Sequence, residues 1–77
     1  MATRAYILIE TQGGRAKQVA LELRAFEGVM SVDVITGTFD IIALIEATNM
    51  STMADLVTGQ VQGTRGVLRT ITCVSAG

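Results

Sequence analysis

The sequence predicts an α+β fold in which strands and helices follow in the order β-α-β-β-α-β. Four runs rich in β-branched and large apolar residues, at 4–11, 29–36, 39–47 and 66–75, indicate the strands. Two segments between them carry apolar residues at helical spacing. An internal repeat supports the order, because residues 9–11 and 28–30 (I-E-T and G-V-M) resemble residues 45–47 and 66–68 (I-E-A and G-V-L). Two βαβ units joined by a hairpin make a ferredoxin-like βαββαβ sandwich of one domain, residues 1–77.

Both helices are predicted from an apolar stripe and from residues at their ends. The first begins at Arg15, after the break at Gly13-Gly14, and is ended by Gly28. Its apolar face is Ala16, Val19, Ala20, Leu23 and Phe26. The second covers roughly residues 51–62 and is capped by Asn49 or Ser51. Its apolar stripe is Met53, Leu56, Val57 and Val61.

The segment Thr36-Gly37-Thr38-Phe39-Asp40 is predicted as the turn of the central hairpin. A two-residue loop with glycine first is typical of a tight type II′ turn, and Gly37 can take a positive φ without steric cost. The cross-strand pairs expected under the helices are then Thr36/Phe39, Val34/Ile41, Val32/Ala43 and Met30/Ile45. The pairs expected on the opposite face are Ile35/Asp40, Asp33/Ile42, Ser31/Leu44 and Val29/Glu46.

The two helices are expected on the same face of a four-stranded antiparallel sheet, because βαβ crossovers are right-handed in about 98% of cases. The face that they leave bare mixes apolar and acidic side chains: Tyr6, Leu8, Val29, Ile35, Ile42 and Leu44 with Glu10, Asp33, Asp40 and Glu46. With 49% hydrophobic residues in a chain of 77, there is more apolar surface than one small core can hide. We expect the protein to dimerise through its sheet, as a dimeric α/β barrel.

The composition excludes several classes of protein. The chain has no His, Trp or Pro and a single cysteine, so disulfide scaffolds, Cys/His zinc sites and imidazole catalysis are excluded, and no metal or cofactor is expected. The six basic residues are scattered and the net charge is −1, which argues against direct nucleic-acid binding. No apolar run is long enough for a membrane span and no signal-peptide pattern is present, so a cytoplasmic protein is expected.

These segments together resemble the effector-binding (RAM) domain of the Lrp/AsnC family of transcription regulators, in the stand-alone form that lacks the helix-turn-helix. The matching segments are A-Y-I-L-I-E-T, F-E-G-V, V-D-V-I-T-G, T-F-D-I-I-A-L-I-E-A, A-D-L-V and G-V-L-R-T-I-T-C-V. Their order and spacing match over nearly the whole chain. The resemblance implies sheet-to-sheet dimers that assemble into tetramers or octamers, and small effectors, usually amino acids, bound between dimers. It also implies a full-length Lrp/AsnC regulator as a partner.

The resemblance further implies a ligand site around the hairpin. Gly37, Thr38, Phe39 and Asp40 match the G-x-[YF]-D motif of the family, and Thr70 and Thr72 match polar positions on its last strand. With Asp55, these residues are expected to line the effector cleft. No helix-turn-helix precedes Arg4 in this sequence, so direct operator binding is not expected.

The hairpin also suits an amino-acid ligand chemically. Backbone N–H groups near Gly37 can receive a carboxylate, Asp40 can pair with an ammonium group, and Phe39 can form a wall of a side-chain pocket. Each residue has a structural interpretation as well. Phe39 could belong to the core, Asp40 could bond the turn backbone, Thr70 and Thr72 could be ordinary strand residues, and Asp55 could be a solvated charge.

Two other functions stay open beside a stand-alone amino-acid-binding and oligomerisation module linked to transcription regulation. Small dimeric α/β barrels include cofactor-independent oxygenases and isomerases, and Tyr6, Glu10, Asp33, Asp40 and Glu46 could supply acid and base groups. Because aliphatic residues fill the helix-side positions, no substrate cavity is expected, and no residue is assigned a catalytic role. The other alternative is a purely structural oligomerisation module.

Overall fold

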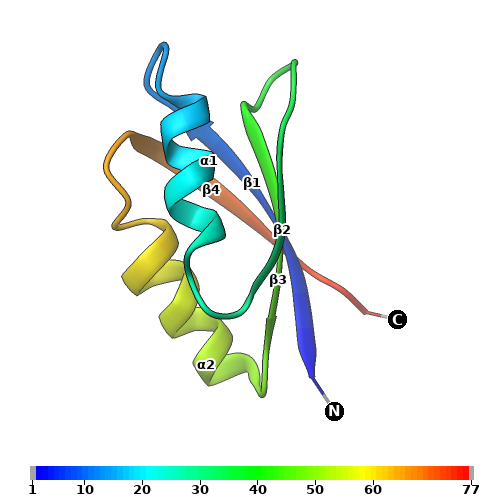
Figure 1. Ribbon diagram of the computed structural model, residues 1–77. Helices are drawn as coiled ribbons and strands as arrows, with labels where there is room; N and C mark the ends of the chain where they lie inside the picture. Colours follow the sequence, from blue (N-terminus) through cyan, green and yellow to red (C-terminus); the bar gives the residue numbers. More distant parts are fainter. Residues whose placement is uncertain (1, 77) are drawn as a thin grey trace.

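The computed structural model describes residues 2–76, which form a four-stranded antiparallel sheet with helices on one face (Figure 1). The elements are β1 (Thr3–Thr11), α1 (Ala16–Arg24), β2 (Val29–Val34), β3 (Ile41–Ala47), α2 (Met50–Asp55), the π-helix η1 (Leu56–Val61) and β4 (Val67–Val74). The strands lie in the order β2-β3-β1-β4. The predicted ferredoxin-like order of elements is confirmed.

The core lies between the sheet and the helix layer. On β1, Ala5, Ile7 and Ile9 are 0% exposed, whereas Tyr6 is 47% exposed on the other face. This alternation is what a strand with one covered face requires. The helix layer contributes the buried residues Val19, Ala20, Leu23, Met53, Leu56, Val57 and Val61. Both predicted apolar stripes therefore face the core, and Phe26 packs against it from just beyond α1.

The internal repeat extends to a glycine and a β-bulge at the start of each edge strand. Gly28 and Gly66 have φ of +95° and +98°. Val29 and Val67, which follow them, pack against the core. The next residues, Met30 and Leu68, are the unpaired residues of bulges, and they are 58% and 57% exposed. Each half of the chain thus enters its edge strand in the same way.

The bulge at Met30 makes part of the predicted hairpin register wrong. Residues 31–34 pair with residues 44–41 as predicted. Val29, however, pairs with Ile45 rather than Glu46 and packs against the core, while Met30 is exposed instead of lying under the helices. The reason is geometric, because one extra residue reverses the face of every side chain before it.

The connection between β2 and β3 is also wider than the predicted two-residue turn. β2 ends at Val34 and β3 begins at Ile41, so residues 35–40 form a loop. Gly37 has a positive φ of +148°, but a type II′ turn needs about +60° at this position. The Ile35 N–H donates to the Asp40 carbonyl at 2.8 Å, so that predicted pair is present. Thr36 is exposed rather than covered by the helices.

α1 ends earlier than predicted, and the second helix, whose ends lie close to the predicted ones, changes its geometry along its length. α1 stops at Arg24, and Gly28 lies in the turn beyond it, where its Cα faces the Glu46 carbonyl. The second helix begins at Met50 and changes from α to π geometry at Leu56. The Gln62 N–H donates to the Val57 carbonyl, five residues back, at 2.8 Å. A π-helix of this kind frequently accompanies a functional site.

Asn49 is the N-cap of α2, and its Oδ1 accepts from the Thr52 N–H at 2.8 Å. Replacing Asn49 by alanine is expected to lower the free energy of unfolding by about 1 kcal/mol, because this N–H loses its acceptor. Urea unfolding at constant protein concentration measures the change. Ser51→Ala is the matched control, since the Ser51 side chain has no hydrogen bond within residues 2–76. An equal loss in both variants would contradict the assignment of the cap.

Candidate ligand-binding site

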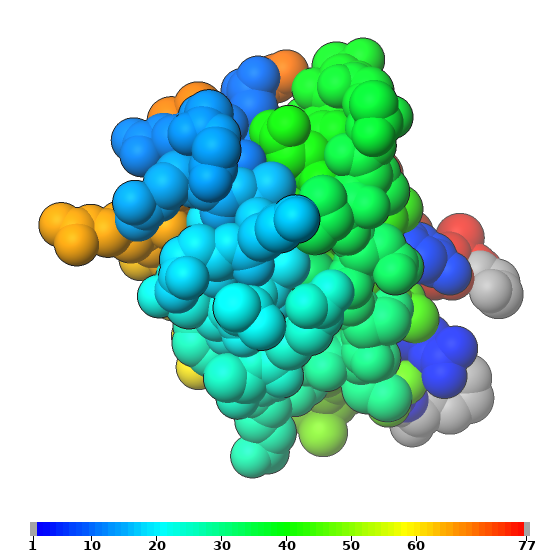
Figure 2. All heavy atoms as spheres, turned by 45° about the horizontal axis from the view of Figure 1, so that its top comes forward, coloured from blue at the N-terminus to red at the C-terminus, as the bar shows by residue number. Residues whose placement is uncertain are grey.

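The hairpin loop is tied to β1 at one end of the sheet. The Asp40 N–H donates to the Ile9 carbonyl at 2.9 Å, and Asp40 Oδ2 accepts from the Thr11 N–H at 2.8 Å. Asp40 is half-buried, and its Oδ1 has no partner within residues 2–76. The loop itself projects at the top of the molecule (Figures 1 and 2). One carboxylate oxygen is therefore structural, and the other is free for a ligand.

Phe39 lies against an arginine of β4 rather than in the core. The Arg69 guanidinium is 5.2 Å from the centroid of the Phe39 ring, and Arg69 Nε donates to Glu10 Oε1 at 3.0 Å. Glu10 and Arg69 are cross-strand partners on the sheet face that the helices leave bare. The predicted position of Phe39 under the helices is wrong, because the loop carries it to this end of the sheet. We call Glu10, Phe39, Asp40 and Arg69 the hairpin cluster.

Thr70 and Thr72 lie on the other face of the sheet. They pair with Ile9 and Ile7, so their side chains point toward the helix layer. Thr70 Oγ1 accepts from Gln62 Nε2 at 3.0 Å, and Thr72 lines a hollow beside α2 with Met50 and Met53 among its other walls. Within one protomer the sheet separates both threonines from the hairpin cluster.

Asp55 is also distant from the hairpin within one protomer. It lines a hollow of about 490 Å³ between α2 and the Glu27-Gly28 turn, together with Glu46 and Thr52. In Figure 1, α2 lies at the end of the molecule opposite the hairpin loop. The predicted site residues therefore form three groups: the hairpin, the two threonines, and Asp55.

Arg69 and Thr11 contact the hairpin residues of the candidate site, and Glu10 pairs with Arg69, although the sequence did not place these three among the expected ligand-binding residues. Their signal is the antiparallel register of the first and last strands, which sets Arg69 opposite Glu10 across 59 residues of chain. Thr11 contacts Asp40 through its backbone N–H. Every residue except proline has this group, so the residue type at position 11 does not indicate the contact. A search confined to short motifs misses contacts of this kind.

The hairpin cluster offers both signs of charge beside an aromatic ring. Arg69 uses Nε for Glu10, so its terminal nitrogens are free to donate to a carboxylate. Asp40 Oδ1 and Glu10 can accept from an ammonium group, and Phe39 offers apolar surface. Within residues 2–76, no three Asp, Glu or Cys side chains converge as metal ligands, and none of the helices has the length and apolarity to traverse a lipid bilayer.

The fold and the hairpin cluster define a small α+β binding domain with one uncovered sheet face. The chain belongs to the family of Lrp/AsnC ligand binding domains, whose profile matches residues 4–76. It is similar to the uncharacterised HTH-type transcriptional regulator PYRAB16920 of Pyrococcus abyssi, with 32% identity over 78 residues that cover 97% of this chain and 52% of the relative. The chain thus spans about half the length of that curated relative.

Solved structures share the fold closely. TTHA0845 from Thermus thermophilus superposes with a TM-score of 0.92 at 27% identity, over 97% of this chain and 94% of that one. The complex of the transcriptional regulator NMB0573 from Neisseria meningitidis with L-Met superposes with a TM-score of 0.87 at 19% identity, over 97% of this chain and 50% of that one. The second similarity is evidence for the fold alone.

Proposed function

We propose that the chain binds a small effector at the hairpin cluster and couples binding to its own assembly. The observation that carries this proposal is the joint position of Arg69, Glu10, Asp40 and Phe39 at one accessible end of the sheet. A few convergent polar groups beside apolar surface are typical of small-molecule sites. Membership of a family of ligand-binding domains supports the same role. The role is regulatory and cytoplasmic, with neither catalysis nor direct contact with nucleic acid.

An amino acid is the ligand that we propose. Arg69 and the backbone N–H groups of the loop receive its carboxylate, while Asp40 and Glu10 receive its ammonium group. The side chain of the ligand packs on Phe39. The presence of L-Met in the complex of the Neisseria meningitidis regulator supports this class of ligand.

The proposed assembly is a homodimer formed through the bare face, which we define by Tyr6, Leu8, Ile42, Leu44 and Ile71. Leu8, Ile42 and Leu44 are half-buried in the protomer, and Tyr6 and Ile71 are exposed. Burial of a continuous apolar face of this kind against a second copy of the chain removes apolar surface from water and so favours a dimer. Further association into tetramers or octamers, or with a full-length Lrp/AsnC regulator, would let Thr70, Thr72 or Asp55 of another copy reach the hairpin cluster.

Ligand binding and assembly are coupled only if the effector has different affinities for the smaller and the larger assembly. An effector that contacts residues of two dimers stabilises the assembly that completes its cleft, and the assembly raises the affinity for the effector by the same factor. The effector therefore changes the population of assemblies rather than the fold of a protomer.

Replacing Asp40 separates the role of its charge from its role in the loop. Asp40→Ala is expected to weaken amino-acid binding at least about tenfold, since a charged hydrogen bond contributes about 1.5–3 kcal/mol. It is also expected to lower the free energy of unfolding by about 1 kcal/mol, because the Thr11 N–H loses its acceptor. The dimer is expected to persist. Titration calorimetry against the common amino acids, with sedimentation at matched concentrations, measures both effects.

Asp40→Asn is the matched control, because its side-chain oxygen still accepts from Thr11 while the charge is absent. We expect this variant to retain the stability of the parent and to lose affinity as Asp40→Ala does. Unchanged affinity in the asparagine variant would contradict the pairing of Asp40 with an ammonium group. A protein whose stability and assembly ignore every amino acid would be a scaffold rather than a sensor.

A further inference from the structure

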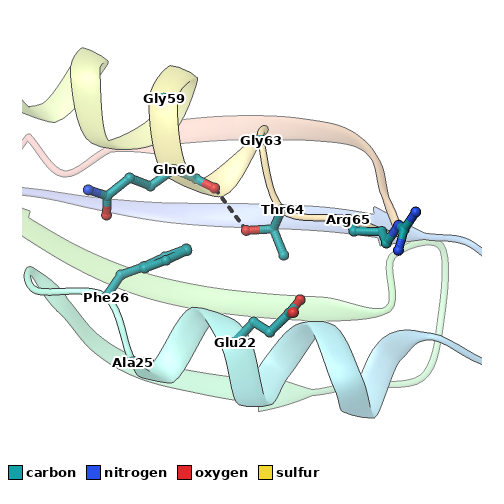
Figure 3. Close-up of a pocket in the computed structure, with 8 residues that line it drawn as sticks. All are labelled: Glu22, Ala25, Phe26, Gly59, Gln60, Gly63, Thr64 and Arg65. Atoms are coloured by element: carbon teal, nitrogen blue, oxygen red, sulfur yellow. Dashed lines mark hydrogen bonds between the residues drawn. The ribbon is translucent and has the colours of Figure 1, made fainter.

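A second concave surface lies in the helix layer, between the end of α1 and the end of η1. This helix groove has a volume of about 530 Å³ and is lined by Glu22, Ala25, Phe26, Gly59, Gln60, Gly63, Thr64 and Arg65. Figure 3 shows the Phe26 ring and the Glu22 carboxylate directed toward the η1 side, with Arg65 at one end. Its size is within the range of small-molecule sites, about 300–1,000 Å³. All of its walls belong to one protomer.

Gly59 leaves space in this groove without any steric need to be glycine. It lies inside η1, its φ is not positive, and a Cβ there would have no heavy atom within 4 Å. Glycine in a helix costs about 0.5–1 kcal/mol relative to alanine. Gly63 differs, because its Cβ would lie 2.8 Å from the Gly59 carbonyl oxygen. Packing therefore explains Gly63, whereas nothing within residues 2–76 crowds a Cβ at Gly59, and the glycine leaves this wall of the groove low.

Glu22, Thr64 and Arg65 lie toward one end of the groove, with the Arg65 guanidinium directed outward, and the Gln60 amide lies toward the other end, near Phe26 (Figure 3). Within residues 2–76, neither Glu22 nor Arg65 has an ion-pair or hydrogen-bond partner. The Thr64 hydroxyl donates to the Gln60 carbonyl at 2.8 Å, which holds the turn that carries Arg65 (Figure 3). Phe26, Ala25 and Gly59 bound the body of the groove. The groove thus has a carboxylate and a guanidinium toward one end and an aromatic ring along its body.

We propose that the helix groove binds a small zwitterion whose two charges lie at one end of an apolar body. Glu22 accepts from the cationic group, Arg65 donates to the carboxylate, and the body lies on the Phe26 ring beside Gly59. The proposal deepens the proposed function, on which it rests for the idea that this chain senses such molecules. The site is nevertheless distinct from the hairpin cluster, because it is complete within one protomer.

The test fills the groove without touching its charges. Gly59→Leu projects a side chain into space that is empty, so the fold is expected to persist, and Gly59→Ala is the matched control, which adds a single methyl group. We expect the leucine variant to lose affinity for L-phenylalanine, L-leucine and L-methionine at least about tenfold, and the alanine variant to change it less than about threefold. Arg65→Gln is expected to cost roughly tenfold through loss of one charged hydrogen bond.

Amide chemical shifts of ¹⁵N-labelled protein locate the site independently of affinity. Shifts at Gly59, Gly63 and Thr64 that persist in Asp40→Asn and vanish in Gly59→Leu would support the groove. Shifts confined to residues 37–40 and unaffected by Gly59→Leu would overturn it and leave the hairpin proposal standing. The absence of shifts in both regions with all three amino acids would overturn the groove proposal as well. Equal shifts with the N-acetylated amide of the same amino acid, which carries neither charge, would refute the roles of Glu22 and Arg65.

Discussion

Replacing Leu8 by lysine is expected to convert the proposed sheet-to-sheet dimer to monomers. Leu8 lies in the middle of the bare face, opposite Ile42 on β3 and Ile71 on β4, so the new ammonium group has no carboxylate directly across from it. A charge buried without a partner costs several kcal/mol. A loss of about 4 kcal/mol raises the dissociation constant of a dimer roughly a thousandfold. Sedimentation equilibrium over a range of concentrations measures this constant, and circular dichroism checks that the monomer is folded.

Leu21→Lys is the matched control for this substitution. Leu21 is 61% exposed on α1, in the other layer of the molecule, so the same change there is expected to leave the proposed dimer intact. If Leu8→Lys sediments as the parent does, the bare face is not the dimer interface. Dissociation of the Leu21→Lys variant alone would instead place the interface on the helices.

Substituting Gly28 by alanine is expected to cost about 2 kcal/mol of stability. Gly28 has a φ of +95°, which is unfavourable for any residue with a Cβ, and a Cβ there would lie 3.1 Å from both the Glu46 carbonyl oxygen and Leu56 Cδ2. The Glu46 oxygen cannot move away easily, because the Glu46 N–H donates to the Gly28 carbonyl at 2.8 Å. For a domain of this size the melting temperature is expected to fall by roughly 10 °C.

The control for Gly28→Ala is Gly13→Ala. Gly13 lies in the first loop, its φ is not positive, and a Cβ there would meet nothing within 4 Å. Its replacement is expected to change the free energy of unfolding by less than about 0.5 kcal/mol, or to stabilise slightly by restricting the unfolded chain. Urea unfolding at fixed concentration compares the two variants. Equal effects would mean that Gly28 is not needed for the turn.

Strand faces could be predicted from the sequence wherever apolar and other residues alternate. Ile7 and Ile9 are buried and Tyr6 is exposed, as expected. A register slip of one residue would expose all the buried apolar side chains of β1 to solvent, so this register is strongly favoured. The start of β2 could not be predicted in this way. Val29 and Met30 are both apolar, so periodicity alone does not say which one enters the core. The repeat of G-V-M in G-V-L shows that the two edge strands begin alike. It identifies valine as the core residue only after the structure has shown the bulge in one of the two strands.

The hairpin residues of the candidate site could be located in the sequence, but their neighbours could not. Gly37, Phe39 and Asp40 form a short local motif, whereas the contact of Arg69 with Glu10 and Phe39 depends on how distant strands align. Thr70 is adjacent to Arg69 in the chain and yet faces the helices, since successive residues of a strand point to opposite faces. Polar residues that are neighbours in the sequence near one strand end can therefore lie on opposite faces of the sheet and belong to different sites.

The sequence by itself determined the order of the elements, the two helical stripes and the apolar face of β1, because these follow from local periodicity and from the internal repeat. Only the tertiary structure decided which residues bulge, where α1 and the hairpin end, and which charges meet at the hairpin. Those outcomes depend on competition for the core between residues such as Val29 and Met30, and on backbone contacts such as that of Gly28 with Glu46. Interactions across 40 to 60 residues of chain, such as Glu10 with Arg69, have no local signature that a sequence pattern can carry.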